Sequence, residues 1–427
     1  MDRNKKHLLI GFFLALAVLA VPFLGRADTA SDLQQKINAQ NNSIQALEAE
    51  IAAYQSQLTA IGKQKNTLSN ALATLALESK KLNADIKVSE GKIAATNLKL
   101  ESLGSSIAKT ASNMDDLRTA IAKDLREMNA QDTDSLAALL ISDNNLSDLW
   151  HYVGQQQLFR GALEEKTGQL ATTKVSLLAN KTQVEAAKAQ LLVLESQLQD
   201  QRTINQKTTA QQNTLLKQTK NQETSYQKLV AQKTALKTQM ETDLHDYESR
   251  LKYVLNPKLL PPSGSSPLAW PLDRIVITQL FGKTVAAARL YVTGSHNGVD
   301  FGTPVGTPVK AMAPGTVIGS GNTDIACSGA SYGNWIFIKY DNGLASVYGH
   351  LSLVKAASGS RVSTGEVVAY SGATGYATGP HLHVSVFPND GVSINSFPSQ
   401  ACPGRTITIP TAAVNAYLDP MLYLPKK

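Results

Sequence analysis

A heptad repeat of apolar residues dominates the first part of the chain and constrains its fold more than any other feature. The repeat begins at Leu33 and continues to Ile121 in steps of three, four or seven residues, without a proline. Positions three and four apart share one face of a helix, so the spacing predicts a single helix of about 95 residues. Gly104 is the candidate position for a break.

A second heptad repeat runs from Leu163 to Val254, and its apolar seam is thin over residues 199–227, which we expect to be its loosest part. The segment 132–160 between the repeats is richer in apolar residues and contains an Asp-Asn-Asn turn signal at 143–145. Two arms of similar length joined by such a tip predict a long antiparallel coiled-coil hairpin over residues 28–254. A parallel coiled-coil dimer is the alternative, because heptads alone do not fix the direction of the partner helix.

The composition changes abruptly after Val254. Residues 255–268 contain four prolines, which do not fit inside a continuous helix, and this segment is predicted to be a linker. Downstream, short runs of Val, Ile, Thr and Tyr alternate with Gly and Pro turns, which predicts mostly antiparallel β structure over residues 269–427. The chain is therefore predicted to be an α+β multidomain protein.

Residues 1–27 resemble an export signal, with a basic start, an apolar stretch over residues 8–24 and small residues before a cleavage site after Ala27. An uncleaved membrane anchor is the alternative, and both place the rest of the chain in the periplasm or the extracellular cell-wall space. The two cysteines, Cys327 and Cys402, suit one disulfide in an oxidising compartment, although free thiols are also compatible with the sequence. The net charge of +7 favours a polyanionic surface such as a cell envelope, and no nucleic-acid-binding motif is present.

Four of the seven histidines fall in the predicted β region beside glycine-rich turns. His296 and Asp300 lie four residues apart, His381 and His383 alternate on a predicted strand so that both rings share one face, and His350 ends another strand. A catalytic zinc ion typically keeps three protein ligands and one water, and His296, Asp300 and His383 fit that count for one zinc per chain. His350 and His381 would then orient the water, carry its proton or stabilise an oxyanion, and the sequence does not divide these roles between them.

Together these motifs resemble the lysostaphin-type (LytM) zinc endopeptidase family over residues 269–425. The shared features are H-x-x-x-D at 296–300, H-x-H at 381–383, YGHL at 348–351, and the segments GVDFGTPVGTPVKA, GEVVAYSGATG and LDPMLYLP. The resemblance implies a β peptidase domain that cuts peptide cross-links of bacterial peptidoglycan, with zinc on His296, Asp300 and His383 and with catalytic His350 and His381. Two segments depart from the family pattern, residues 320–333 and 393–407, and each carries one of the cysteines. A disulfide between them would shape the rim of the cleft.

The tip sequence SLAALLISDNNLSD between long Gln-rich helices resembles the coiled-coil hairpin of EnvC-type and PcsB-type regulators of cell-wall hydrolysis, over residues 30–255. We expect a hairpin segment, for which 199–227 is the candidate, to restrain the peptidase until a membrane partner engages the tip. The resemblance itself implies docking to an FtsEX-type membrane complex and control of a wall-cutting domain during cell division or wall remodelling. It also raises the alternative of a non-catalytic activator of a separate cell-wall amidase. Such activators usually lack zinc ligands, whereas all are present here, and a purely structural spacer would not explain the histidines. The oligomeric state is left open.

Overall fold

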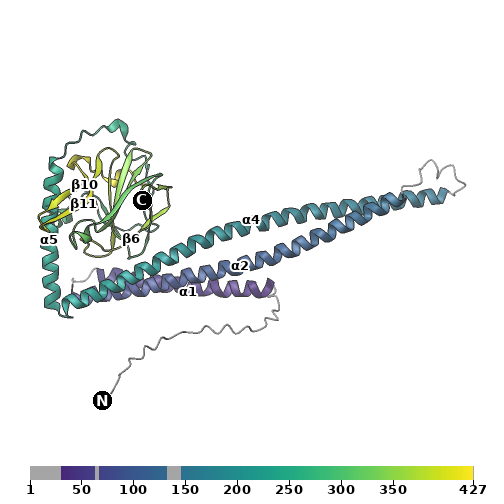
Figure 1. Cartoon of the computed structure of the whole chain (residues 1–427), viewed down its shortest axis with the longest axis horizontal. Coiled ribbons are helices and arrows are strands. Elements are labelled where there is room, and N and C mark those ends of the chain that lie inside the picture. Colours follow the sequence, from purple (N-terminus) through teal and green to yellow (C-terminus); the bar gives the residue numbers. More distant parts are fainter. Residues whose placement is uncertain (1–29, 63–66, 132–145, 427) are drawn as a thin grey trace, which may run out of the picture. The chain divides into compact units, whose positions relative to one another are not determined.

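The computed structural model describes residues 30–62, 67–131 and 146–426, so the predicted export signal and residues 132–145 of the predicted hairpin tip lie outside the described residues. Long helices come first and a β domain follows (Figure 1). By their contacts the described residues form two compact units, one of residues up to Ala39 with Leu98–Val184, the other of Gln40–Asn97 with the rest of the chain from Glu185. Among these residues, no helix is both long enough and apolar enough to cross a membrane.

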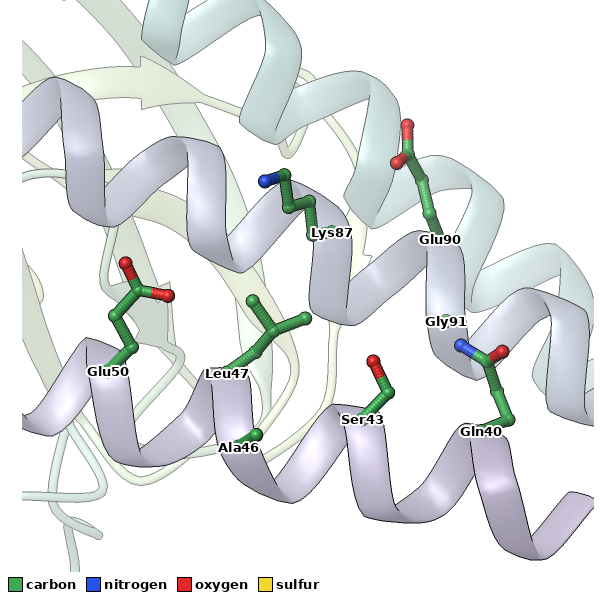
Figure 2. Close-up of a pocket in the computed structure, with 8 residues that line it drawn as sticks. All are labelled: Gln40, Ser43, Ala46, Leu47, Glu50, Lys87, Glu90 and Gly91. Atoms are coloured by element: carbon green, nitrogen blue, oxygen red, sulfur yellow. The ribbon is translucent and has the colours of Figure 1, made fainter.

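The prediction of one unbroken helix through the first heptad repeat is wrong. Helix α1 (Ala30–Gly62) ends before α2 (Leu68–Gln131) begins, and Thr67 caps α2 by accepting a hydrogen bond from the Asn70 N–H at 3.2 Å. Helix α1 then packs back along α2, where Lys92 lies 3.3 Å from Glu48 and the two helices border a groove of about 570 Å³ (Figure 2). No break occurs at Gly104, because α2 is continuous there.

The antiparallel hairpin is confirmed by the pairing of α2 with α4 (Leu146–Thr219). Ser89 donates to Gln201 at 2.7 Å, and farther along α2 Asp124 pairs with Lys166 at 2.5 Å. As residue numbers rise in α2, those of their partners in α4 fall, so the two helices run in opposite directions. These pairs lie within one chain and do not require a dimer.

The second heptad repeat is also divided into two helices. Lys220 and Asn221 have φ angles of 49° and 55°, which end α4 in a tight turn before α5 (Glu223–Arg250). This turn lies inside the interval whose seam is thin, but the interval is regular helix up to Thr219, and Ile204 within it is fully buried. Ile204 packs with Leu82, Val305 and Tyr370 and so joins the hairpin base to the β domain.

The β domain is confirmed as mostly antiparallel. Its nine-stranded sheet has the order β1-β2-β9-β6-β5-β4-β7, and β8 pairs with both β3 and β6. The strands are β1 (Ile277–Gln279), β2 (Val299–Gly302), β3 (Pro308–Lys310), β4 (Gly315–Asn322), β5 (Asn334–Tyr340), β6 (Leu344–Val354), β7 (Arg361–Val362), β8 (Val367–Ser371) and β9 (His381–Pro388). The short helices are α6 (Val285–Leu290), η1 (Pro257–Leu259), η2 (Thr323–Ile325), η3 (Val414–Ala416) and η4 (Pro420–Leu422).

The central strands are buried on both faces, which explains their nearly continuous apolar sequences. In β5, Ile336 and Ile338 belong to one apolar cluster, while Trp335 and Phe337 belong to another on the opposite face. The second cluster also contains Met240 of α5 and apolar side chains of the hairpin formed by β10 (Val392–Ser399) and β11 (Arg405–Ala412). Helix α5 is therefore part of the core of this unit.

A disulfide joins Cys327, just after η2, to Cys402, at the turn between β10 and β11, with the two Cα atoms 5.9 Å apart. The two segments that depart from the family pattern are thus covalently linked, as the cysteine count suggested. Cys327 is almost fully buried, and the connection holds the η2 segment against the β10–β11 hairpin.

Candidate metal centre

Three neighbouring strands bring the predicted ligands together. In the antiparallel register, Asp300 of β2 lies opposite His383 of β9, and His383 lies opposite Gly349 of β6. His296 precedes β2 and is held by reciprocal backbone hydrogen bonds with Gly282. The chain between His296 and Asp300 passes so close to β9 that a Cβ atom at Gly298 would lie 2.4 Å from a carbonyl oxygen of β9, which requires glycine there.

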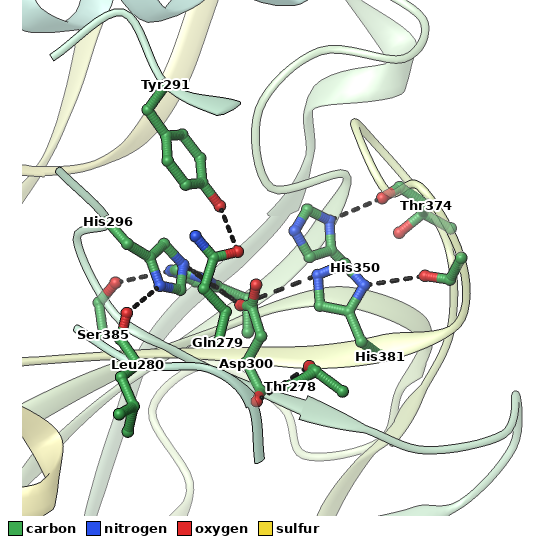
Figure 3. A network of polar contacts seen from close by, with 12 residues as sticks. Thr278, Gln279, Leu280, Tyr291, His296, Asp300, His350, Thr374, His381 and Ser385 are labelled. Carbon is green, nitrogen blue, oxygen red and sulfur yellow. Dashed lines mark hydrogen bonds and ion pairs between the residues drawn. The ribbon is translucent and has the colours of Figure 1, made fainter. Parts of the chain in front are cut away.

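The three predicted ligands form a buried triangle. Figure 3 shows two of its members, His296 and Asp300, with His350 and His381 nearby. Asp300 Oδ1 lies 2.8 Å from His383 Nδ1 and 3.3 Å from His296 Nε2, and the two imidazole nitrogens are 3.2 Å apart. Ligands placed about 2.0–2.1 Å from a tetrahedral zinc ion lie about 3.4 Å from one another, so the triangle has the size of three corners of such a site. The donor set of two imidazoles and one carboxylate also suits zinc.

The second nitrogen of each ligand histidine has its own partner. His296 Nδ1 lies 3.1 Å from the Leu280 carbonyl oxygen, which only accepts hydrogen bonds, so Nδ1 carries the proton and Nε2 is free as a ligand. His383 Nε2 lies 2.9 Å from Ser385 Oγ, which leaves Nδ1 for the metal. Such outer contacts fix ring orientation and tautomer in metal sites.

Electrostatics keep the carboxylate ionised. Burial opposes ionisation of Asp300, but its close interactions with His296 and His383 outweigh burial and hold the pKa of the carboxyl well below its usual range. Burial lowers the pKa of His383, which favours the neutral imidazole that a metal requires.

His350 and His381 lie beside this triangle with matching tautomers. His350 Nδ1 lies 2.9 Å from the Thr374 carbonyl oxygen and His381 Nδ1 lies 2.8 Å from the Gly379 carbonyl oxygen, so both Nδ1 atoms donate and both Nε2 atoms keep a lone pair. The two ring centroids are 4.5 Å apart, and His381 Nε2 is 3.8 Å from Asp300 Oδ1. Burial lowers the pKa of His350 well below the usual value, with neighbouring His381 and His383 adding to the effect.

Backbone conformation brings His350 to the correct face of the sheet. His350 follows Gly349, the partner of His383, so regular alternation would turn its side chain to the opposite face. Its φ angle of 60° breaks that alternation, and its ring centroid lies 6.0 Å from that of His383. The structure therefore gathers all five residues singled out in the sequence.

Sequence reasoning missed the residues of α5 that reach the site. Lys237 Nζ lies 4.7 Å from the ring centroid of Tyr291 and 4.6 Å from that of Tyr376, and it donates to the Leu290 carbonyl. Tyr291 in turn stacks on His296, with ring centroids 5.1 Å apart. These contacts join segments far apart in the sequence, and no local pattern around Lys237 signals them.

The segment 199–227, which we expected at the cleft, instead contacts the domain through Asp200 and Ile204.

Comparison with known proteins finds a family match over the residues that form this centre. Residues 294–396 match the sequence model of Peptidase family M23. The C-terminal part of the chain is an M23 domain. It is 42% identical over 88 residues to the DD-carboxypeptidase/endopeptidase Mpg of Neisseria meningitidis, and 41% identical over 88 residues to the peptidoglycan DD-endopeptidase ShyA of Vibrio cholerae. Each of these alignments covers 21% of this chain and 19% of the relative, so the chain spans about a fifth of the length of these relatives.

Lysostaphin of Staphylococcus simulans is 40% identical over 91 residues, or 21% of this chain and 17% of lysostaphin. The solved catalytic domain of lysostaphin is 29% identical, and the match covers 35% of this chain and 92% of that domain with a TM-score of 0.26. The M23 match contains all five site residues.

The groove between α1 and α2 has no part in this centre, since it is lined only by residues of the hairpin.

Proposed function

We propose that this protein is an exported zinc-dependent endopeptidase that cleaves peptide cross-links of bacterial peptidoglycan. The observation that carries the proposal is the triangle of His296, Asp300 and His383, flanked by two further histidines with free Nε2 atoms. In this proposal the triangle holds zinc, and His350 and His381 are catalytic. The names of M23 relatives, which include peptidoglycan DD-endopeptidases, support this substrate class.

When bound, zinc supplies Lewis-acid activation of a water molecule and of the scissile carbonyl. His350 and His381 are the groups of this chain that handle protons. A neutral ring with a free Nε2 accepts the proton that the water loses, and the protonated ring then donates a hydrogen bond to the developing oxyanion or returns the proton to the leaving amine. The carbonyls of Thr374 and Gly379 hold the rings in the tautomer that this sequence of steps requires.

The same arrangement disfavours the non-catalytic alternative. An activator of a separate amidase has no need for a complete ligand triangle, two correctly protonated flanking imidazoles and a backbone conformation that turns His350 toward them. Several of these features cost stability, since burying ionisable groups and holding a non-glycine residue at positive φ are both unfavourable.

The proposal includes regulation by the helical region. Access to the centre is restricted, because His296 is 1% exposed and His350 is 7% exposed. Helix α5 contacts the loops on two sides of the centre through Lys237, which bridges Tyr291 and Tyr376. We infer that α5, rather than the 199–227 segment, restrains the peptidase, and that movement of the hairpin opens the cleft.

An FtsEX-type membrane complex that engages the hairpin is the proposed trigger, and it rests on the resemblance of the tip sequence alone. Cell division or wall remodelling would be the setting, in the periplasm or the extracellular cell-wall space. The disulfide between Cys327 and Cys402 supports an oxidising compartment.

The decisive experiment combines zinc content with product chemistry. Full-length protein and His383→Ala would be compared for bound zinc by mass spectrometry and for fragments released from purified peptidoglycan. New termini at peptide cross-links, lost together with zinc in the variant, would support the endopeptidase. Zinc binding without any cleavage, combined with stimulation of a purified cell-wall amidase, would instead favour the activator.

A further inference from the structure

Asp324 lies in the segment that departs from the family pattern and ties it to the turn beside the metal centre. Its Oδ1 accepts a hydrogen bond from the Gly329 N–H at 2.6 Å, and its Oδ2 accepts one from the Gly375 N–H at 2.8 Å. One carboxylate thus closes its own loop and holds a second loop 51 residues away. The residue before Gly375 is Thr374, whose carbonyl accepts the His350 Nδ1–H.

The two loops are in direct contact, so a shift in one is transmitted to the other. A Cβ atom at Gly375 would lie 2.2 Å from the Gly333 nitrogen, and both glycines have positive φ angles. Tyr376 N donates to the Ser331 carbonyl at 3.0 Å, and Asn334 N donates to Thr374 Oγ1 at 2.9 Å. These contacts couple the two loops, so a change at Asp324 is transmitted to the Thr374 peptide.

The loop that carries Asp324 is itself anchored at its far side. Cys327 is bonded to Cys402, and the N–H groups of Gln400 and Ala401 donate to Asp243 of α5 at 2.7 and 3.1 Å. The anchor therefore lies outside β2, β6 and β9, the strands that carry Asp300, His350 and His383.

We propose that Asp324 is a positioning residue that fixes the orientation and tautomer of His350 through the Gly375 N–H and the Thr374 carbonyl. This inference deepens the proposed endopeptidase function. Without the Asp324 contact, the turn at 374–375 relaxes, the Thr374 carbonyl rotates away from Nδ1, and the His350 ring loses its single tautomer. Asp324 touches neither zinc ligand nor flanking imidazole, so metal binding is unaffected. Loss of a supporting contact of this kind lowers activity by roughly 10–100-fold.

The test uses the full-length zinc-loaded protein and two substitutions. Asp324→Asn has the same shape but places an amide NH₂ against one of the two backbone N–H groups, so one hydrogen bond is lost. Asp341→Asn is the matched control, because Asp341 pairs with exposed Arg361 in the same domain. NMR of protein labelled with ¹⁵N-histidine reads the tautomer of His350, assigned with His350→Gln.

We expect wild type and Asp341→Asn to show a slowly exchanging His350 Nδ1 proton, and Asp324→Asn to lose it. Zinc content and KM should be unchanged in Asp324→Asn, with kcat on purified peptidoglycan about 10–100-fold lower. An Nε2–H tautomer in the wild type would overturn the inference even if the variant did not fold, and so would a retained Nδ1 proton or a loss of zinc in Asp324→Asn. If no protein shows peptidase activity, the proposed function fails, whereas the NMR comparison still decides the role of Asp324.

Discussion

Replacing Lys237 with alanine should increase peptidase activity, because this side chain fastens α5 to the loops around the metal centre. Its side chain is 8% exposed, and its Nζ lies over two tyrosine rings and 3.2 Å from Glu241 Oε1. A desolvated cation–π contact is worth roughly 2 kcal/mol, so the two together contribute about 2–4 kcal/mol to the seating of α5. Each 1.4 kcal/mol changes an equilibrium constant about tenfold. Losing about 2 kcal/mol would therefore raise the population of molecules in which α5 has left the domain by about 30-fold.

We expect an increase in cleavage rate of about 30-fold, the value for a loss of about 2 kcal/mol, because other contacts of α5 remain. Asp243 still accepts from two backbone N–H groups, and Met240 stays in the apolar cluster beneath the helix. Removing Lys237 also leaves the partly buried carboxylate of Glu241 without its cation, which adds to the local destabilisation.

The assay is the rate of fragment release from dye-labelled peptidoglycan by the full-length protein, with zinc content measured on the same samples. Lys228→Ala is the matched control, because Lys228 is an exposed lysine of the same helix. Hydrogen exchange of α5, followed by mass spectrometry, reports whether the helix has loosened. Faster exchange in Lys237→Ala with an unchanged rate of cleavage would refute the reasoning, since α5 would then move without affecting access.

Three further outcomes are expected. His383→Ala should lose bound zinc and activity together, because two protein ligands do not complete the site, and zinc analysis with the cleavage assay checks this. His350→Ala and His381→Ala should each lower the cleavage rate by about two to four orders of magnitude while zinc is largely retained; zinc loss in His381→Ala with retention in His383→Ala would show the two roles to be exchanged. Glu248 on α5 has a pKa raised by burial from 4.5 to about 7, so the folded state keeps a proton that the unfolded state loses. Stability from this group is fully present below pH 4.5 and falls by about 3 kcal/mol as the pH rises through 7. Glu248→Gln should therefore narrow the difference between thermal unfolding midpoints at pH 5 and pH 8, and exposed Glu185→Gln should not.

The heptad repeats predicted the helices and their hairpin because helix formation and coiled-coil packing depend on local spacing. The break between α1 and α2 escaped prediction because it leaves the local spacing unchanged. Ile61 and Leu68 are seven residues apart, so the apolar repeat continues in register from one helix to the next and does not signal the break. The signal that was present is Thr67, a favourable N-cap residue three positions before its hydrogen-bond donor Asn70.

The candidate site was predictable to a similar extent. The spacing of His296 and Asp300, and the alternation of His381 and His383, identified residues that the structure brings together through the pairing of β2 with β9. The sequence did not divide the roles of the histidines, because protonation depends on carbonyls contributed by distant turns. The Thr374 carbonyl that fixes His350 is 24 residues away in the chain.

The contacts of α5 with the β domain have a property that suits a reversible restraint. Asp243 and Lys237 both bind main-chain groups of the domain, and these groups can exchange their partner for water when the helix leaves. Net free energies of such hydrogen bonds are small, about 0.5–1.5 kcal/mol each and up to about 3 when one group is charged, because water replaces the lost partner. Apolar contacts such as that of Met240 lack this compensation, since their exposure costs free energy in proportion to area. The charged contacts of α5 are therefore the ones that release at low cost, whereas the apolar contacts of Leu236, Met240, Leu244 and Tyr247 hold the helix on the domain and set the free energy that a pull on the hairpin must supply.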